Sequence, residues 1–513
     1  MSLFDRTFHP DEANQAFTTG RLLETGMYRY DPGDHHGPTL YYAAAAIQKA
    51  AGANNTASLN ETLLRCTPLL FAVLTLVLCF AAARKILHKS NFGRDLPPFL
   101  LTALVATSPV FVFFATDFIQ EMLLACFTMS MLWAATGYAF SLPASDSGPR
   151  KIKPGSWALF LGISAGLAFA TKETSVLAFA AIFFPALASA VFCRKNSVSC
   201  GFPGLGQLPS HLVLAFAGFV LTAVLFYSSF AQNWQGVYSA FVAAPLSYAC
   251  RATGDAASEG AAYHVHPWWQ HLKWLFGGKM AFAAYSAIGI SLGLYSLCRD
   301  RDQKAIPLPL KAALGAMLGF AMLLAAIYSG IPYKTPWCAL QMHVPLLIAA
   351  FLGLLAFSKC GTAGRIAFIA SSVVLLCENM SISAKMWSAP DSRDIPYNYA
   401  SASPQAKDMA GLIASLVRTG PAAQAPGRSR PFVAIALPSE DTWPLPFYLR
   451  SLNADVGYWT QFGELEALAG LKRNPDIVVV PAEEGHLVQP LFPHLKNTRR
   501  FEMRHRVRVR VFW

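Results

Sequence analysis

The chain has 513 residues, of which 54% are hydrophobic and only 14% are charged. Soluble domains carry about 25% charged residues, so this composition excludes an ordinary soluble globule. The net charge of +12 would suit a nucleic-acid-binding protein, but the basic residues gather in alternate connections between apolar runs. The positive-inside rule expects this distribution of cytoplasmic loops, so we expect no nucleic-acid partner.

Residues 1–63 are polar and aromatic and precede every apolar run. They contain the acid pair Asp11–Glu12 in "HPDEANQAF" and, further on, "DHHGPTLYY" (34–42). The stretch "GPTLYYAAAAIQKAAG" (37–52) predicts a short helix at the membrane interface. Because the region holds only four Lys/Arg, we expect it to be the first extracytoplasmic loop.

About ten apolar runs follow, and most are near the roughly 18 residues that mark a membrane span. They predict an all-α polytopic membrane domain over 64–385, with a long external loop at 231–278 that contains "HPWWQHLKWLF". The tryptophans of this loop suit the interfacial aromatic belt. The runs are 64–83, 97–115, 118–140, 156–171, 174–193, 211–230, 279–298, 312–329, 338–358 and 366–384.

The basic connections set the orientation of the spans. We expect a multi-pass protein of the plasma (inner) membrane whose basic connections lie in the cytoplasm. The segments 117–121, 171–174 and 329–337, together with everything after about 385, then face the extracytoplasmic space. The basic connections include Lys89, Arg150, Lys151, Arg301 and Lys304.

A small extracytoplasmic α/β domain is predicted over 386–513. "PFVAIAL" (431–437) and "DIVVV" (476–480) read as buried strands, with helical stretches at 406–418 and 463–472. The strict alternation of "RVRVRVFW" (506–513) predicts a strand with one arginine face. Such a face could bind a polyanion, although a solvated strand face is the favoured interpretation.

Four polar stretches share the external side and combine acids with lysines. A carboxylate there can deprotonate an acceptor hydroxyl as general base, and a lysine can stabilise a departing phosphate. A lipid-linked phosphosugar would present its phosphate at this level, with its tail in the bilayer. The stretches are Asp11–Glu12, "DFIQE" (117–121), "TKETS" (171–175) and "YKTPW" (333–337).

Each stretch also has a purely structural interpretation. The acid pair would suit a helix start, because carboxylates favour helix N-termini, and Lys172–Glu173 would suit an interfacial anchor whose side chains reach toward water. His264, His266 and His271 have a loose metal-like spacing, but an amphipathic interfacial helix explains them better, so we assign no metal ligands. A divalent metal held by carboxylates stays open, and no cofactor is predicted with certainty.

The motifs, in this order, resemble the C-type membrane glycosyltransferases related to dolichyl-phosphate-mannose–protein mannosyltransferases (glycosyltransferase family 39-like). Within these the sequence is most similar to the flippase-activity-associated protein branch of archaeal-type glycosylation. The resemblance runs along most of the chain. It is carried by "DEANQA", "YDPGDHHGPTLYY", "FIQE", "TKET", "HPWWQHL", "YKTPW", "WPLPFYLR" and "VGYW".

The resemblance implies a polyprenyl-phosphate-linked sugar donor in the membrane lipid and a protein, lipid or glycan acceptor outside. It implies inverting displacement, with Asp11 as catalytic base and Glu12 as its neighbour in positioning or acceptor binding. Glu121 would line the same cavity, with Glu173 as a further cavity acid. Donor phosphate or sugar binding falls to Lys172, Lys334, His36 and Tyr333.

Two departures from the family pattern stand out. The family places a membrane helix before its first external loop, whereas Met1 is too close to Asp11 for a span. Either the start lies further upstream, or residues 1–63 are exported without a leading helix. The basic residue expected just before "FIQE" is also replaced by Thr116 and Asp117.

Two other classes of function compete with an enzyme. A transporter or flippase component for lipid-linked sugars would carry ionisable residues at mid-span, whereas the charges here lie at outer span ends. A C-terminal binding module with a membrane anchor would not need about ten spans. The sequence therefore favours the transferase.

Overall fold

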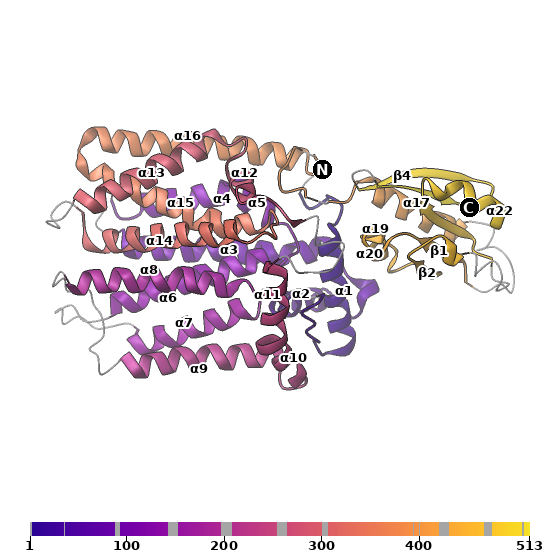
Figure 1. The fold of residues 1–513 in the computed structure, drawn as a ribbon, viewed down its shortest axis with the longest axis horizontal. Helices are drawn as coiled ribbons and strands as arrows, with labels where there is room; N and C mark the ends of the chain where they lie inside the picture. The colour runs from indigo at the N-terminus through magenta and orange to yellow at the C-terminus, as the bar shows by residue number, and fades with distance from the viewer. Residues whose placement is uncertain are drawn as a thin grey trace. The chain divides into compact units, whose positions relative to one another are not determined.

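The structure, a computed structural model, describes residues 3–34, 36–87, 93–141, 152–195, 208–253, 264–299, 306–392, 394–399, 401–419, 430–465, 474–504 and 507–513 (Figure 1). His35, most of the predicted helix 463–472, and Lys89, Arg150, Lys151, Arg301 and Lys304 of the basic connections lie outside these ranges. The chain forms two compact units. The helical unit comprises 27–44 and 65–387, and the mixed unit comprises 1–26, 45–64 and 388–513.

The apolar runs predicted as spans all become helices. Seven of the helices in the described ranges are long and apolar enough to cross a membrane, and three more apolar helices are shorter. Together with the six-residue helix α5 (Pro109–Phe114), these helices are α3 (Glu61–Ile86), α4 (Leu96–Thr107), α6 (Glu121–Ser141), α7 (Pro154–Phe169), α8 (Ser175–Lys195), α9 (Leu208–Tyr227), α13 (Met280–Arg299), α14 (Leu308–Gly330), α15 (Cys338–Phe357) and α16 (Thr362–Ser388).

The run 97–115 forms two helices rather than one. Ser108 has an extended backbone, and Pro109 begins α5. Proline has no N–H to donate into the preceding turn, and it disfavours the helical conformation of the residue before it. The apolar pattern therefore marks the segment correctly but cannot show the break.

Small residues set the closest helix contacts of the helical unit. A Cβ atom on Gly162 of α7 would lie 1.9 Å from the carbonyl oxygen of Ala215 in α9, and one on Gly353 of α15 would lie 2.0 Å from that of Gly289 in α13. Such contacts let helix backbones approach closely in a membrane. Helix α15 is the most enclosed, with 89% of its apolar window buried, against 11% for α9.

The external loop is helical in pieces. It contains α10 (Trp234–Tyr238), the π-helical turn η2 (Ser239–Ala243), α11 (Ala244–Thr253) and α12 (Gln270–Phe276). Trp268 and Trp269 are exposed, as an interfacial belt requires, whereas Trp274 is buried. The tryptophan-rich motif therefore divides between surface and core.

The mixed unit is built around a five-stranded sheet with the order β2-β1-β3-β5-β4. Strand β1 (Phe432–Ala436) pairs in parallel with β2 (Asp455–Trp459) and β3 (Ile477–Pro481). Strand β5 (Val507–Phe512) runs antiparallel to both β3 and β4 (Thr498–Arg504). The small α/β domain predicted from the sequence is present, with β2 and β4 in addition.

Both faces of this sheet are covered. One apolar core joins Val433 and Val509 to α17 (Gln405–Thr419). The other joins Val478 and Phe512 to residues that include Phe492. The alternation predicted for β5 holds, because Val509 and Val511 are buried while Arg508 is exposed.

The N-terminal segments belong to the same unit. They form α1 (Pro10–Thr25), the second half of α2 (Thr39–Ala50) and the short turn η1 (Thr56–Ser58). Phe8 stacks on Phe447 of α20 (Leu445–Leu449) with ring centroids 4.6 Å apart, and Phe17 meets Trp443 edge-on at 5.6 Å. These aromatic contacts attach α1 to the C-terminal part of the chain.

Candidate functional site

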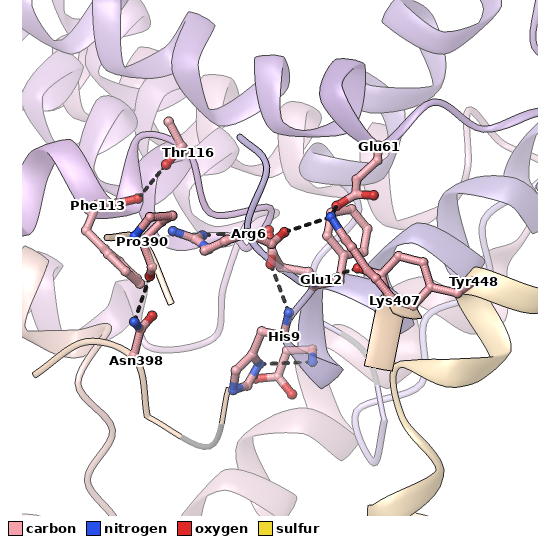
Figure 2. Close-up of polar contacts among 12 residues, drawn as sticks. Arg6, His9, Glu12, Glu61, Phe113, Thr116, Pro390, Asn398, Lys407 and Tyr448 are labelled. Carbon is pink, nitrogen blue, oxygen red and sulfur yellow. Dashed lines mark hydrogen bonds and ion pairs between the residues drawn. The ribbon is translucent and has the colours of Figure 1, made fainter. Parts of the chain in front are cut away.

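The acid pair Asp11–Glu12 lies in the first turn of helix α1, whose N-cap is His9. Figure 2 shows His9 and Glu12 at this helix end. The backbone N–H of His9 donates to Glu12 Oε2 at 3.0 Å, and the N–H of Asp11 donates to His9 Nδ1 at 3.1 Å. Because the His9 side chain also accepts from the Glu12 backbone, His9 and Glu12 form a capping box, which satisfies N–H groups that the helix itself cannot. The structural role proposed for the pair, a helix start, is thus present.

Glu12 is the buried member of the pair. Its side chain is fully buried, and Oε1 lies 3.8 Å from the Arg6 guanidinium. One carboxylate oxygen therefore faces a cation while the other caps the helix. Glu12 therefore fixes the start of α1.

Asp11 is the accessible member of the pair. Its side chain is 47% exposed, and it lies in the first turn of α1, where the helix dipole favours a carboxylate. An accessible carboxyl group on a fixed helix end could serve as a general base.

His9 holds this helix end as a neutral ring. Its Nε2 lies 2.9 Å from the carbonyl oxygen of Tyr399, so Nε2 must be the donor. Nδ1 accepts from the Asp11 N–H, so it carries no proton. The 3.7 Å approach of Asp11 Oδ2 to Nδ1 is therefore not an ion pair.

In the helical unit, the loop before α2 docks on the turn between α7 and α8. The Thr39 N–H donates to the Ala170 carbonyl at 3.2 Å, and the Thr39 and Thr171 hydroxyls lie 2.7 Å apart. A Cβ atom on Gly37 would lie 2.3 Å from the Ala170 oxygen, so only glycine fits there. This docking brings the "HGPT" and "TKET" motifs together.

His36 and Glu173 meet across this contact. His36 Nδ1 lies 2.9 Å from Glu173 Oε2, and the Tyr30 hydroxyl donates to Oε1 at 2.6 Å. Burial alone would raise the pKa of Glu173, but His36 and these hydrogen bonds outweigh burial and lower it. Glu173 is therefore a carboxylate with both oxygens engaged.

Lys172 and Glu121 form a buried ion pair beside it. Glu121 is the first residue of α6, and its carbonyl accepts from Gln341 Nε2 at 2.9 Å. Burial would lower the pKa of Lys172, but Glu121 and nearby Cys338 raise it above its ordinary value. Lys172 is therefore charged, and any phosphate that binds it must share it with Glu121.

Tyr333 and Lys334 lie on a short extended pairing with the external loop. The Lys334 N–H donates to the His264 carbonyl at 2.7 Å, and Val265 forms an isolated bridge with Tyr333. The Tyr333 and His264 rings lie 4.8 Å apart. The Lys334 ammonium is buried against the Ile331 carbonyl, and burial lowers its pKa.

The histidines of the external loop lie close to Lys334 and to aromatic side chains. Burial and then Lys334 lower the pKa of His271 to about 4, and the same two causes lower the pKa of His266. His271 packs between the Trp274 and Tyr328 rings, at centroid distances of 5.4 and 5.8 Å. In the described ranges no three His, Cys, Asp or Glu side chains are grouped to hold a metal ion.

The predicted site residues thus fall into two sets. Asp11 and Glu12 belong to the mixed unit, and the others belong to the helical unit. Within the helical unit, the "YKTPW" turn lies near Lys172, because Thr335 contacts Cys338 at 3.3 Å and Cys338 acts on the Lys172 charge. The set consists of His36, Glu121, Lys172, Glu173, Tyr333 and Lys334.

Sequence reasoning missed the side chains that fix these groups. Arg6, Tyr30 and Gln341 each contact a predicted site residue. Tyr30 is the first residue of the quoted "YDPGDHHGP" stretch, so the motif could be recognised, but its contact with Glu173 could not be predicted. Nothing in the sequence marks Gln341, which lies inside an apolar run.

Comparisons with known proteins bear on the fold. No family model and no curated relative matches the sequence. The chain is similar to ArnT from Cupriavidus metallidurans bound to undecaprenyl phosphate, with 15% identity and a TM-score of 0.60 over 99% of this chain and 94% of that chain. It is also similar to AglB, the archaeal oligosaccharyltransferase of Archaeoglobus fulgidus, in complex with an inhibitory peptide and a dolichol-phosphate. That match has 14% identity and a TM-score of 0.50 over 96% of this chain and 68% of that chain.

These likenesses extend over nearly the whole chain at low identity, so they concern architecture. They agree with the apolar helices in identifying a multi-pass membrane protein. They also agree with the resemblance carried by the sequence motifs. The chain shares the fold of ArnT and, over the matched part, that of AglB.

Proposed function

We propose that this protein is a membrane glycosyltransferase that moves a sugar from a polyprenyl-phosphate donor to an acceptor on the extracytoplasmic side of the plasma membrane. The observation that carries the proposal is the polar set of the helical unit. Two lysines, a histidine and two carboxylates gather at one end of apolar helices. ArnT, whose fold this chain shares, was solved with undecaprenyl phosphate, which supports a lipid phosphate as the ligand of this set.

The exposure of the Asp11 side chain supports its assignment as the general base. Its carboxylate takes the proton of an acceptor hydroxyl while the oxygen attacks the anomeric carbon of the sugar. The bond between that carbon and the phosphate oxygen breaks in the same step, so the anomeric centre inverts. The lipid phosphate leaves with the electron pair.

The departing phosphate gains negative charge, which fixed cations stabilise. Lys172 and Lys334 are the cations assigned to it, and His36 and Tyr333 supply hydrogen-bonding groups. Because Lys172 already pairs with Glu121 and Lys334 already bonds a carbonyl, both are held in place before the donor arrives. Preorganisation of this kind is what makes electrostatic stabilisation effective.

The transporter alternative gains no support from the intramembrane acid Glu378. This residue lies within α16, but its carboxylate accepts the backbone N–H groups of Ala281 and Phe282, at 2.7 and 2.9 Å. It therefore caps the start of α13. A structural role accounts for the charge, and no ion pathway is needed.

The test is transfer by the purified protein in lipid nanodiscs supplied with undecaprenyl-phosphate-linked sugars. Mass spectrometry of cell-envelope glycans, with and without the protein, identifies the acceptor. We expect a glycan that is lost in the absence of the protein and free undecaprenyl phosphate as co-product. Unchanged envelope glycans together with no release of lipid phosphate would refute the transferase.

A further inference from the structure

The pair His36–Glu173 defines a hydrogen-bond direction. Glu173 has a lowered pKa and is ionised, so it offers only acceptors. Its Oε2 lies 2.9 Å from His36 Nδ1, and Nδ1 must therefore carry the proton. The ring then engages a ligand through Nε2, the nitrogen on the opposite side. Which nitrogen of a histidine acts is commonly set by the bond that the other nitrogen makes.

Further hydrogen bonds hold both His36 and Glu173 in place. Glu173 is fixed by Tyr30 through its other oxygen at 2.6 Å. The His36 carbonyl accepts from the Tyr28 hydroxyl at 2.5 Å, so the backbone of His36 is held as well as its ring. The His36 side chain still keeps 26% of its surface exposed. Part of the held side chain is therefore accessible from outside.

We propose that Glu173 is a positioning residue that holds His36 with Nδ1 protonated, so that Nε2 binds the phosphate of the polyprenyl carrier. Glu173 then acts through His36 and does not contact the carrier itself. When Nε2 gains a proton, the imidazolium faces the phosphate as a cation and Glu173 balances its charge. The inference rests on the proposed function for the identity of the ligand.

The electrostatic surroundings of the pair are largely neutral at ordinary pH. The aromatic hydroxyls near Glu173 have pKa values raised chiefly by their burial, so they remain protonated. Lys172 is the nearby cation, and its charge is matched by Glu121. A change in the charge of His36 is therefore felt mainly by Glu173 and by a bound phosphate. The titratable groups around the pair are Tyr28, Tyr30, Tyr41, Tyr227, Asp34 and Lys172.

The experiment measures the affinity for undecaprenyl phosphate of the full-length protein in nanodiscs, from pH 5.5 to 8.5. It compares wild type, Glu173→Gln, His36→Gln and the double variant. The lipid phosphate itself titrates in this range, so each affinity is divided by that of His36→Gln at the same pH. Asp31→Asn is the matched control, because Asp31 is an exposed acid of the same loop whose carboxylate accepts the N–H of nearby Gly33 at 2.8 Å.

We expect the wild-type ratio to rise as pH falls and to reach about tenfold, the size of effect expected when a positioned charge-assisted contact is lost. For Glu173→Gln the ratio should stay near one at every pH, and the double variant should bind no more weakly than either single variant. Asp31→Asn should follow wild type. Tyr30→Phe keeps the carboxylate and should give an intermediate ratio, which preserves the test where Glu173→Gln fails to fold.

Two results would overturn the inference. One is a Glu173→Gln ratio that follows the wild-type pH dependence. The other is an added loss of affinity when Glu173→Gln is placed in the His36→Gln background. Sugar transfer is assayed separately, so the two proposals can fail separately. Binding that follows the pattern without any transfer supports the His36–Glu173 pair and refutes the transferase, whereas transfer without the pattern does the reverse.

Discussion

Glu12 Oε2 accepts the backbone N–H of His9 at 3.0 Å, and this bond closes a capping box at the start of α1. Because the Glu12 carboxylate also faces Arg6, it serves both the helix end and a buried cation. The neighbouring Asp11 thereby stands on a fixed helix end. In the acid pair, Glu12 fixes the start of the helix and Asp11 is accessible.

Replacement of Glu12 should therefore affect stability in two steps. Glu12→Gln keeps a side chain that can cap His9 but loses the charge facing Arg6. Glu12→Ala loses both and should cost about 2 kcal/mol, since a lost cap costs about 1 kcal/mol and a buried polar group without its partner costs a similar amount. Thermal unfolding of the purified variants should rank wild type above Glu12→Gln and Glu12→Ala last. Equal midpoints for the two variants would contradict the role of the cap.

Replacement of Asp11 should affect transfer rather than stability. Asp11→Asn should lower the transfer rate by about 10²–10⁴-fold, the usual contribution of a general base, because an amide cannot accept the proton. Asp408→Asn is the matched control, since Asp408 is likewise an exposed acid in the first turn of a helix. Its transfer rate should stay at the wild-type level. Retained transfer in Asp11→Asn would remove Asp11 as the base.

Lys172 and Glu121 should behave as a coupled pair. Lys172→Met leaves Glu121 as a buried charge without its cation, which typically costs about 3–5 kcal/mol. Adding Glu121→Gln should restore much of the lost stability while leaving transfer absent. Thermal unfolding and transfer assays on the two single variants and the double variant check this. Additive losses of stability would show that the residues do not act on one another.

Gly37 should tolerate no side chain. In Gly37→Ala the new methyl group would lie 2.3 Å from the Ala170 carbonyl, so the loop must move away from the turn that carries Lys172 and Glu173. We expect weaker binding of undecaprenyl phosphate. Gly411→Ala, in α17, is the control. Its methyl group meets nothing within 4 Å, and alanine is the better helix former by about 1 kcal/mol.

His271 should make stability depend on pH. Its pKa of about 4 lies below the reference value of 6.5, so between these values the unfolded chain binds a proton that the folded chain does not. Stability should therefore fall as the pH drops from 6.5 to 4, by about 3 kcal/mol in total. His271→Phe should remove this part of the dependence. The check is the unfolding midpoint of both proteins at pH 6.5 and pH 4. The midpoint of wild type should fall more than that of His271→Phe between these two values.

Local pattern predicted most of the architecture, because apolar runs report burial or lipid contact directly. It placed the helices of the membrane region, the strands β1, β3 and β5, and the helix start at Asp11. It failed at β4, whose outer half "TRR" is exposed at the sheet edge, and at Ser108, where one proline divides a uniform run. Neither feature alters the spacing of hydrophobic residues in the sequence, so the pattern does not reveal it.

The site could be predicted only in its components. The motifs supplied acids, lysines and a histidine, but not which of them would meet. Glu173 joins His36 across 137 positions and Lys172 joins Glu121 across 51, and the sequence gives no sign of either pairing. The acid pair has one buried and one accessible member because Glu12 faces Arg6, and Arg6 belongs to none of the recognised motifs.

The mixed unit combines N-terminal and C-terminal segments, which are synthesised at different times. Phe8 contacts Phe447, His9 contacts the Tyr399 carbonyl, and Lys407 binds Glu61, which lies 346 positions earlier in the chain. Closing loops of this length is slow compared with forming local helices. In a partly synthesised chain, the acid pair would lack these contacts. The helix end that carries Asp11 is therefore fixed only after the residues of the sheet have been synthesised.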